Sequence, residues 1–368
     1  MTKRGWFTLI HSFFLFYCCS VYAQNILWQE TTIPMHEAGA QGLETLLVWP
    51  NSPGMHPLAL ISHGSPRDAK QRQNMSALSF LPIAKEFARR GFAVAVVLRR
   101  GYGHSGGGWA ESYGSCQATA YPHAALAAAK DLHAAINYLA TQPQFDVEHI
   151  IPVGVSAGGF ATVALTAFSP PKGLVAAISF AGGRGSSAKD SVCQEEQLIA
   201  TFGLFGKTSR TPMLWVYAQN DHFFNLPLAA QFLKAFNGNG GQATLMQAPA
   251  FANDGHRLFS TAGIPVWTPI VDAFLQKQAL NLFKKPLPLP ELANLSAPRQ
   301  LSSANKKAFS AYLKSPPHKA FAISALGAFG WSSGRHSLDE AKTKALNACN
   351  QYSKISCHLY AAEDNYTN

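Results

Sequence analysis

The sequence predicts an α/β fold in which a mostly parallel β-sheet is covered by helices on both faces. Between residues 57 and 280, short apolar runs alternate with longer amphipathic segments, as in consecutive strand–helix units. Strands that are apolar throughout are typical of a sheet buried on both sides. The 368 residues are 47% hydrophobic and only 14% charged, which is enough to bury a large core and excludes disorder.

The expected elements follow one another in a regular order. The segment from Ile26 to Trp49 is expected to add antiparallel edge strands. The strands of the parallel part are expected at Leu58–Ser62, Phe92–Leu98, Ile150–Val155, Val175–Phe180, Met213–Ala218 and Ala243–Gln247. The helices are expected at Met75–Arg90, Ala124–Ala140, Gly158–Phe168, Pro227–Phe236 and Thr268–Gln278.

The N-terminus has the features of an export signal. Lys3 and Arg4 precede an apolar stretch, and Ala23 is a small residue of the kind that signal peptidase accepts. A membrane anchor is the alternative, but the stretch is short for a span and contains polar residues. We therefore expect residues 1–23 to be removed and the protein to be periplasmic or secreted.

The charge balance is basic, with a formal net charge of +10 that falls by two when Lys3 and Arg4 are removed. The basic residues between 284 and 307 lie in Pro-rich sequence without interleaved aromatic residues, which argues against nucleic-acid binding. We interpret this run as a solvated linker that contacts, at most, an anionic envelope surface.

Two domains are expected after the signal. Residues 24–280 form the first, and residues 281–303 form a linker, because their four prolines leave room for no regular element. Residues 304–368 form a small C-terminal α+β domain. Its elements are expected to be a strand at Ala320–Ala325, a helix that Ser337 and Glu340 cap and that ends near Asn350, and a strand at Cys357–Ala362.

A candidate nucleophile stands between the third parallel strand and its helix. The residues are Gly154-Val155-Ser156-Ala157-Gly158, a G-x-S-x-G pattern in a strand–turn–helix context. A serine on such a sharp turn projects its hydroxyl into a cleft, and the flanking glycines let neighbouring backbone approach closely. The pattern predicts that Ser156 is a catalytic nucleophile.

A serine hydroxyl needs a base, and the base needs an orienting acid. Asp221 follows the strand Met213–Ala218, and His256 lies between the last strand and the last helix, so the chain order is Ser, Asp, His. His222 and His104 are alternative bases, and Asp254 is an alternative acid. We predict Asp221 as the acid and His256 as the base, because only His256 follows the last strand.

The backbone N–H groups of Ser65 and Ala157 are expected to form an oxyanion hole. Ser65 follows the strand Leu58–Ser62, and Ala157 follows the candidate nucleophile at the start of a helix. His63, two residues before Ser65, is expected to be structural.

Four segments together resemble the dienelactone hydrolase and prolyl-oligopeptidase-like branch of the α/β-hydrolases. They are Ser62-His63-Gly64-Ser65, Arg99 to Gly107, Gly154 to Gly159 and Asn253 to His256. The resemblance covers roughly residues 55 to 280 and implies an eight-stranded sheet, a mechanism without metal or cofactor, and ester or amide substrates. Dienelactone hydrolase proper uses a cysteine where this chain has Ser156, so its lactone substrate is not carried over. The pattern from Trp331 to Cys357 resembles a small domain of unknown function in exported bacterial proteins.

Three residues near the expected cleft are candidates for substrate binding. Arg100, like its neighbour Arg99, ends a strand and either holds a substrate carboxylate or braces a loop. Tyr102 and Trp109, together with Tyr113, either line a pocket or pack within the loop.

Four cysteines remain after the signal, and an even number in an oxidising compartment predicts two disulfides. Cys116 and Cys193 lie in loops that leave the same edge of the sheet, so we expect them to pair. Cys349 and Cys357 are expected to form a local bridge. Two buried free thiols are the alternative for the first pair.

The sequence therefore predicts an exported serine hydrolase that cleaves carboxylic esters through an acyl-enzyme, with small-molecule esters or short peptides as substrates. A peptidase of the aminopeptidase type is the alternative, because the same groups cleave amides when the pocket holds the amine side strongly. Residues 304–368 are alternatively a binding or envelope-anchoring module.

Overall fold

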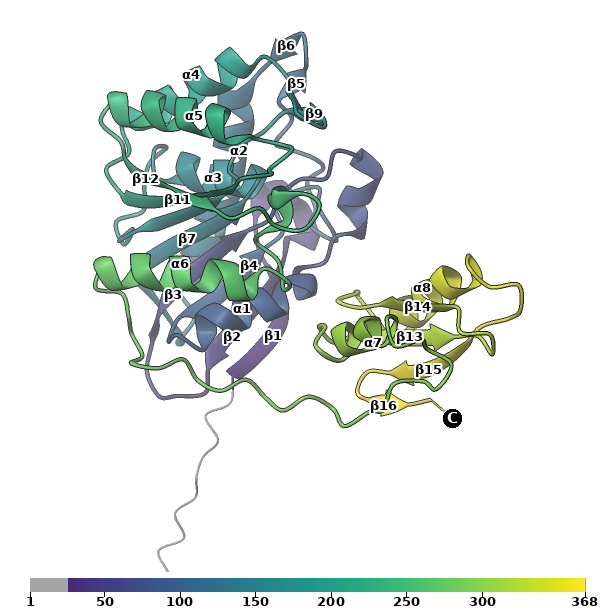
Figure 1. The fold of residues 1–368 in the computed structure, drawn as a ribbon. Coiled ribbons are helices and arrows are strands. Elements are labelled where there is room, and N and C mark those ends of the chain that lie inside the picture. The colour runs from purple at the N-terminus through teal and green to yellow at the C-terminus, as the bar shows by residue number, and fades with distance from the viewer. Residues whose placement is uncertain (1–25, 368) are drawn as a thin grey trace, which may run out of the picture.

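The structure is a computed structural model that describes residues 26–367, and it contains two regions joined by a long connection (Figure 1). The predicted export signal at residues 1–23 lies outside the described residues. Within residues 26–367, no helix is both long and apolar enough to cross a membrane.

The first region is built on the mixed eight-stranded sheet that the sequence predicted. The strand order is β1-β2-β4-β3-β7-β8-β11-β12. β1 and β2 are antiparallel to their neighbours, and the other six strands run parallel. The strands are β1 (Ile26–Ile33), β2 (Leu43–Pro50), β3 (His56–Ser62), β4 (Ala93–Val97), β7 (Phe145–Val155), β8 (Ala177–Phe180), β11 (Pro212–Ala218) and β12 (Gln242–Ala248).

Helices cover both faces of this sheet, as expected (Figure 1). Alternate residues of a strand point to opposite faces. In β3, Ala59 and Ile61 pack in the cluster that contains α1 (Leu81–Ala88) and α6 (Ile264–Lys277). Leu58 and Leu60 pack on the other face, which the remaining helices cover. These are α2 (Tyr121–Leu139), α3 (Ala157–Leu165), α4 (Glu195–Gly206) and α5 (Leu226–Gly238).

Two helices differ from the sequence prediction. The helix expected from Met75 begins only at Leu81, because the residues before it form two 3-10 turns and Pro82 stands at the start of the helix. α4 was not expected at all, although Leu198, Phe202 and Phe205 repeat at helical spacing and are buried. Two short hairpins project nearby, β5 (Gly114–Ser115) with β6 (Ala118–Thr119) and β9 (Ser186–Ala188) with β10 (Ser191–Val192).

The connection from residue 281 to 305 contains no helix or strand. It is held to the first region at Arg89, whose carbonyl accepts from the Leu287 N–H and whose Nε donates to the Leu287 carbonyl at 2.6 Å.

The C-terminal region is a four-stranded sheet in the order β14-β13-β15-β16 with one helix on each face. Phe321 and Ile323 pack with α7, and Ala320 and Ala322 pack with α8. Ser337 caps α8, since its Oγ accepts from the Glu340 N–H at 3.1 Å. The elements are α7 (Lys306–Leu313), β13 (Ala320–Ile323), β14 (Phe329–Ser332), α8 (Leu338–Asn350), β15 (His358–Ala362) and β16 (Asn365–Tyr366). α7, β14 and β16 were not expected.

Candidate active site

Ser156 stands on a strained turn between β7 and α3. Its backbone has φ 57° and ψ −122°, a conformation that costs free energy in a residue with a Cβ and that recurs at functional sites. The turn is tight enough that a Cβ on Gly154 would overlap the carbonyl of Gly158, and one on Gly158 would overlap the carbonyl of Ser62. The glycines of the motif are therefore required by close backbone approach.

His256 and Asp221 form a pair at the same end of the sheet. His256 Nδ1 lies 3.1 Å from Asp221 Oδ2, and the Asp221 side chain is fully buried. Oδ1 of this carboxylate also accepts from the N–H groups of Phe223 and Phe224, at 2.7 and 2.9 Å. The Phe223 ring stacks on the imidazole with the ring centres 3.8 Å apart. The carboxylate and the imidazole are thus held in fixed orientations.

The structure separates this pair from the alternatives. Asp254 Oδ1 accepts from the backbone N–H groups of His256 and His222, so it caps the loop and does not bond the His256 ring. His222 Nδ1 is paired with Asp190, and His104 stacks on His336 of the C-terminal region. Of these five candidates, Asp221 and His256 are the two that are bonded to each other through the imidazole ring.

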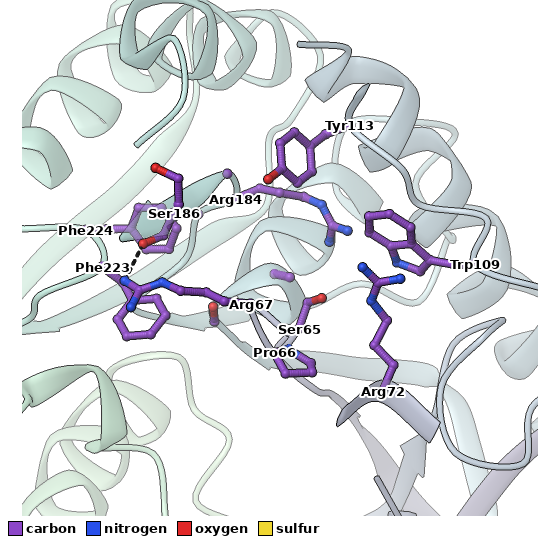
Figure 2. Close-up of a pocket in the computed structure, with 15 residues that line it drawn as sticks. Ser65, Pro66, Arg67, Arg72, Trp109, Tyr113, Arg184, Ser186, Phe223 and Phe224 are labelled. Atoms are coloured by element: carbon purple, nitrogen blue, oxygen red, sulfur yellow. Dashed lines mark hydrogen bonds between the residues drawn. The ribbon is translucent and has the colours of Figure 1, made fainter. Parts of the chain in front are cut away.

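Ser156 opens onto two hollows that differ in their lining. The first, of about 270 Å³, also reaches Ala157 and is lined by Arg67, Arg72 and Arg184, and we name it the arginine cavity (Figure 2). The second, of about 860 Å³, also reaches His256, and we name it the histidine groove. Among the described residues, no hydrogen bond joins Ser156 Oγ to His256. Such contacts often tighten only when substrate is bound.

The expected oxyanion donors lie beside Ser156. Ser65 and Ala157 both line the arginine cavity with it. A Cβ on Gly64 would lie 3.1 Å from the Ser156 Cβ, so the loop that carries Ser65 approaches the serine closely. Within residues 26–367, neither the Ser65 N–H nor the Ala157 N–H has an acceptor. Both amides are therefore free to bind an oxyanion.

His63 holds this loop in place, as expected for a structural residue. Its Nε2 accepts from the Arg99 N–H at 3.0 Å, so Nδ1 carries the proton and donates to the Gly64 carbonyl at 2.7 Å. Burial, together with the nearby Arg99 guanidinium, lowers the pKa of His63 to about 3. The imidazole is therefore neutral at physiological pH.

A buried carboxylate that the sequence analysis missed organises the surroundings of the site. Glu111 accepts from Arg99 Nε at 2.6 Å, from Arg184 Nη1 at 2.9 Å and from the Tyr102 hydroxyl. Burial by itself favours the neutral acid, but the two guanidinium groups hold the pKa of Glu111 well below its usual range. The Tyr102 hydroxyl is in turn bonded to Ser65 Oγ at 2.7 Å, so this ion network reaches the loop that carries Ser65.

Two of the three residues expected to bind substrate line neither of the two hollows. Arg100 lines neither hollow, because its Nε and N–H are bonded to Asp131 at 2.6 and 2.8 Å. It braces the loop, which was the alternative role. Tyr102 is fully buried beneath the loop and positions Ser65 without lining a hollow. The expectation of substrate contact is corrected for both residues.

Trp109 does line the arginine cavity, and so does Tyr113 (Figure 2). The Arg72 guanidinium lies 3.4 Å from the centre of the Trp109 ring, and that of Arg184 lies 5.7 Å from it. Arg67, Arg72 and Arg184 were not expected from the sequence to line a pocket. The one sequence signal for these three arginines is that they are basic residues in loops next to the motifs.

The four cysteines form the two expected disulfides, one in each region of the structure. Cys116 is bonded to Cys193, and the bridge joins the β5–β6 hairpin to the end of the β9–β10 hairpin beside the arginine cavity. Cys349 is bonded to Cys357 and ties the end of α8 to the start of β15.

Comparison with solved structures finds chains with a similar fold. An esterase from the planctomycete Thermogutta terrifontis is 18% identical, with 70% of this chain and 96% of that chain covered and a TM-score of 0.48. An esterase from Pyrococcus furiosus is 13% identical, with coverage of 69% and 90% and a TM-score of 0.45. A puromycin-hydrolyzing peptidase from Mycobacterium tuberculosis is 14% identical, with coverage of 71% and 40% and a TM-score of 0.49. Likeness at this level says nothing about substrate.

No curated protein matches the chain in sequence. The family model described as "Dienelactone hydrolase family" matches residues 77–277, which is more than half of the chain and includes the motif around Ser156 and the Asp221–His256 pair. The chain is thus a serine hydrolase of α/β-hydrolase fold that belongs to the dienelactone hydrolase family.

Proposed function

We propose that the protein hydrolyses carboxylic esters through an acyl-enzyme, with Ser156 as nucleophile, His256 as base and Asp221 as the acid that orients His256. The observation that carries the proposal is the Asp221–His256 pair, 3.1 Å apart, beside a serine held in a left-handed backbone conformation. This is the arrangement of nucleophile, base and orienting acid that acyl transfer requires.

Each group has one task in the proposed reaction. His256 Nε2 takes the hydroxyl proton while Ser156 Oγ attacks the substrate carbonyl, and the N–H groups of Ser65 and Ala157 stabilise the oxyanion that forms. The tetrahedral intermediate collapses, the bond to the leaving alcohol breaks, and His256 returns the proton to the alcohol oxygen. Water then attacks the acyl-enzyme with His256 again as base, which releases the carboxylic acid and restores Ser156.

The two hollows divide the substrate between them in this scheme. The imidazole must reach the leaving oxygen, so the leaving group lies in the histidine groove, which His256 lines. The acyl part then lies in the arginine cavity, which contains Ala157 but not His256. We expect a short acyl chain, because the cavity has a volume of only about 270 Å³.

Labelling with a fluorophosphonate tests the nucleophile directly. The wild-type protein is expected to be labelled once, at Ser156, and Ser156→Ala to be unlabelled. Ser187→Ala is a matched control, since Ser187 lines the same cavity and, among residues 26–367, its hydroxyl is bonded only to Ser191. Labelling at another residue, or labelling of Ser156→Ala, would overturn the assignment.

A substrate panel then separates esterase from peptidase. Acetate, butyrate and hexanoate esters of one phenol are compared with aminoacyl amides of a matched aniline. Turnover of the short esters, with little turnover of amides, is expected. Preference for aminoacyl amides would make the protein a peptidase with the same three residues.

We also propose that the protein is exported with residues 1–23 removed. The two disulfides support this, because such bridges persist in oxidising compartments and are rare in the cytosol. N-terminal sequencing of protein from the periplasm and the medium is expected to begin at Gln24. An intact N-terminus on cytosolic protein with free thiols would contradict it.

A further inference from the structure

The C-terminal region contributes two cations to the histidine groove. Arg335, which precedes α8, and Lys344, within α8, line the groove together with Ser156 and His256. The remaining charged residues of its lining are Arg67 and Asp68. The groove therefore has a basic wall that comes from a part of the chain outside the match to the hydrolase family.

These two cations are available to a ligand. Arg335 Nε donates to the hydroxyl of Ser332 at 2.6 Å, and within the described residues its guanidinium is paired with no carboxylate. Lys344 Nζ lies 3.6 Å from Glu340, a long contact between side chains that are both about one-third exposed. Surface contacts of that kind contribute little.

Arg335 is fixed relative to the catalytic residues by its two neighbours in sequence. Gly334 packs so closely on Ser79 that a Cβ there would lie 2.8 Å from the Ser79 Cα. His336 Nε2 is bonded to Glu44 Oε2 at 3.1 Å, and its ring stacks on His104 with the centres 3.7 Å apart. Because Arg335 stands between two contacts with the hydrolase region, the basic wall has a set position at the groove.

We propose that Arg335 and Lys344 recognise an anionic group on the leaving part of the substrate, so that the C-terminal domain is a specificity element of the active site. The substrates favoured are esters whose alcohol part carries a carboxylate or a phosphate. This inference rests on the proposed function for placing the leaving group in the histidine groove. A guanidinium and an ammonium bind either anion, and they would contact it only when the ester lies across Ser156.

The turnover experiment uses three aryl acetates with the same acyl group. 4-Acetoxybenzoate carries a carboxylate, 4-acetoxyphenyl phosphate carries a phosphate, and methyl 4-acetoxybenzoate is neutral. The full-length wild-type protein is expected to prefer one or both anions in kcat/KM, and the ratio of the two tells which anion fits. In Arg335→Gln/Lys344→Gln, the preference over the neutral ester is expected to fall about tenfold, mainly through KM, with turnover of the neutral ester unchanged.

Two further variants separate recognition from a structural effect. Lys342→Gln removes a cation from the same helix that does not line the groove and is expected to keep the preference. Arg335→Lys is expected to restore part of it. Added salt should weaken the preference of the wild type but not its turnover of the neutral ester. Equal losses on neutral and anionic esters, or the same loss in Lys342→Gln, would overturn the proposal.

Equilibrium binding gives a readout that does not need turnover. In Ser156→Ala, 4-hydroxybenzoate and 4-hydroxyphenyl phosphate are titrated against methyl 4-hydroxybenzoate, with and without the Arg335→Gln/Lys344→Gln change. If an anion binds more tightly than the neutral phenol, and the double variant loses this difference, the proposal is supported. It is supported even if the wild type hydrolyses no ester, and in that case only the proposed function fails. Ester turnover without any anion preference in binding or kcat/KM overturns the proposal and leaves the function standing.

Discussion

Two histidine–carboxylate pairs of equal length occur in different regions of the molecule. His256 Nδ1 lies 3.1 Å from Asp221, and His336 Nε2 lies 3.1 Å from Glu44 across the contact between the two domains. The pairs differ at the second ring nitrogen. Nε2 of His256 has no hydrogen-bond partner among the described residues, whereas Nδ1 of His336 lies 3.6 Å from Glu340.

The free nitrogen decides what each pair can do. A general base needs an unoccupied nitrogen that faces the proton it takes, and His256 lines the groove that contains Ser156. His336 has carboxylates at both nitrogens and another imidazole against its face, so neither nitrogen is unoccupied and the residue joins the two surfaces. The same two residue types thus form the proposed catalytic pair in one place and a contact between the two regions in the other.

The largest effect is expected when the proposed nucleophile or the proposed base is removed. Ser156→Ala and His256→Ala are each expected to lower kcat by about 10⁴- to 10⁶-fold, because nucleophile and base act as one unit. His149→Ala is the matched control, since His149 is exposed, is bonded to Asp146 at 2.7 Å and lines neither hollow. Circular dichroism should show that all three variants are folded. More than a tenth of wild-type kcat in Ser156→Ala would disprove the nucleophile assignment.

Asp221→Asn tests the role of the Asp221 carboxylate. This variant is expected to lose about tenfold less kcat than His256→Ala loses. The amide keeps the shape of the side chain but does not stabilise the imidazolium. Asp254→Asn is the comparison variant, because Asp254 accepts only backbone N–H groups here. If Asp254→Asn lowered kcat on the same ester more than Asp221→Asn did, Asp254 would be the orienting acid instead of Asp221.

The two disulfides, one in each domain, extend the comparison to stability. Cys116 and Cys193 are separated by 77 residues and Cys349 and Cys357 by 8. Each disulfide stabilises the protein by restricting the unfolded chain. Removing the first is therefore expected to lower the free energy of unfolding by about 4 kcal/mol, and removing the second by about 2 to 3 kcal/mol. Denaturant titration of the paired Cys→Ser variants measures both.

The first bridge is also expected to affect catalysis, because it joins hairpins beside the arginine cavity. Reduction should lower ester turnover at temperatures where the protein is still folded, while Cys349→Ser/Cys357→Ser should not. Equal activity of reduced and oxidised protein would remove this link between the bridge and the cavity.

The smallest expected effect is a pH dependence of the domain contact. The hydrogen bond to Glu44 raises the pKa of His336. Burial disfavours the charged form of Glu44, but hydrogen bonds from His336 and from the backbone of His104 and Ala77 lower its pKa overall. The His336 contribution is therefore complete below about pH 6.5 and is lost as the pH rises through its raised pKa. The Glu44 contribution is complete above about pH 4.5 and is lost in stronger acid.

The contact should therefore be strongest between these two limits. The difference in melting temperature between wild type and His336→Gln is expected to be largest near pH 5.5 and to shrink by pH 8.5. Glu340, Glu30 and His104 also face this histidine and remain in both proteins. A difference that does not change with pH would mean that the contact depends on packing alone.

Much of the fold could be predicted because its signals are local. The parallel strands are continuous apolar runs, and each was located to within a few residues except β7, which extends five residues further towards the N-terminus. α4 was missed because its apolar spacing lies in a stretch that otherwise has the composition of a loop. α1 was expected too long, because helix periodicity does not distinguish an α-helix from the 3-10 turns that precede it.

Some residues of the candidate site could likewise be predicted from local patterns, and others could not. The residues around Ser156 could be identified because a left-handed serine between close backbone segments requires glycines at fixed spacing. Asp221 and His256 followed from their positions after the last two strands. The role of Arg100 could not be predicted, since its partner Asp131 lies 31 residues away on α2.

The sequence by itself determined the class of fold, the order of the candidate catalytic residues and the family, because the apolar runs of the strands and the glycines around Ser156 are local patterns along the chain. The tertiary structure decided which charges line the two hollows beside Ser156. Arg184 reaches Glu111 across 73 residues, and Arg335 reaches the histidine groove from the C-terminal region. Such placements depend on how distant segments pack, and a charged side chain in a loop carries no local signal of what it will face.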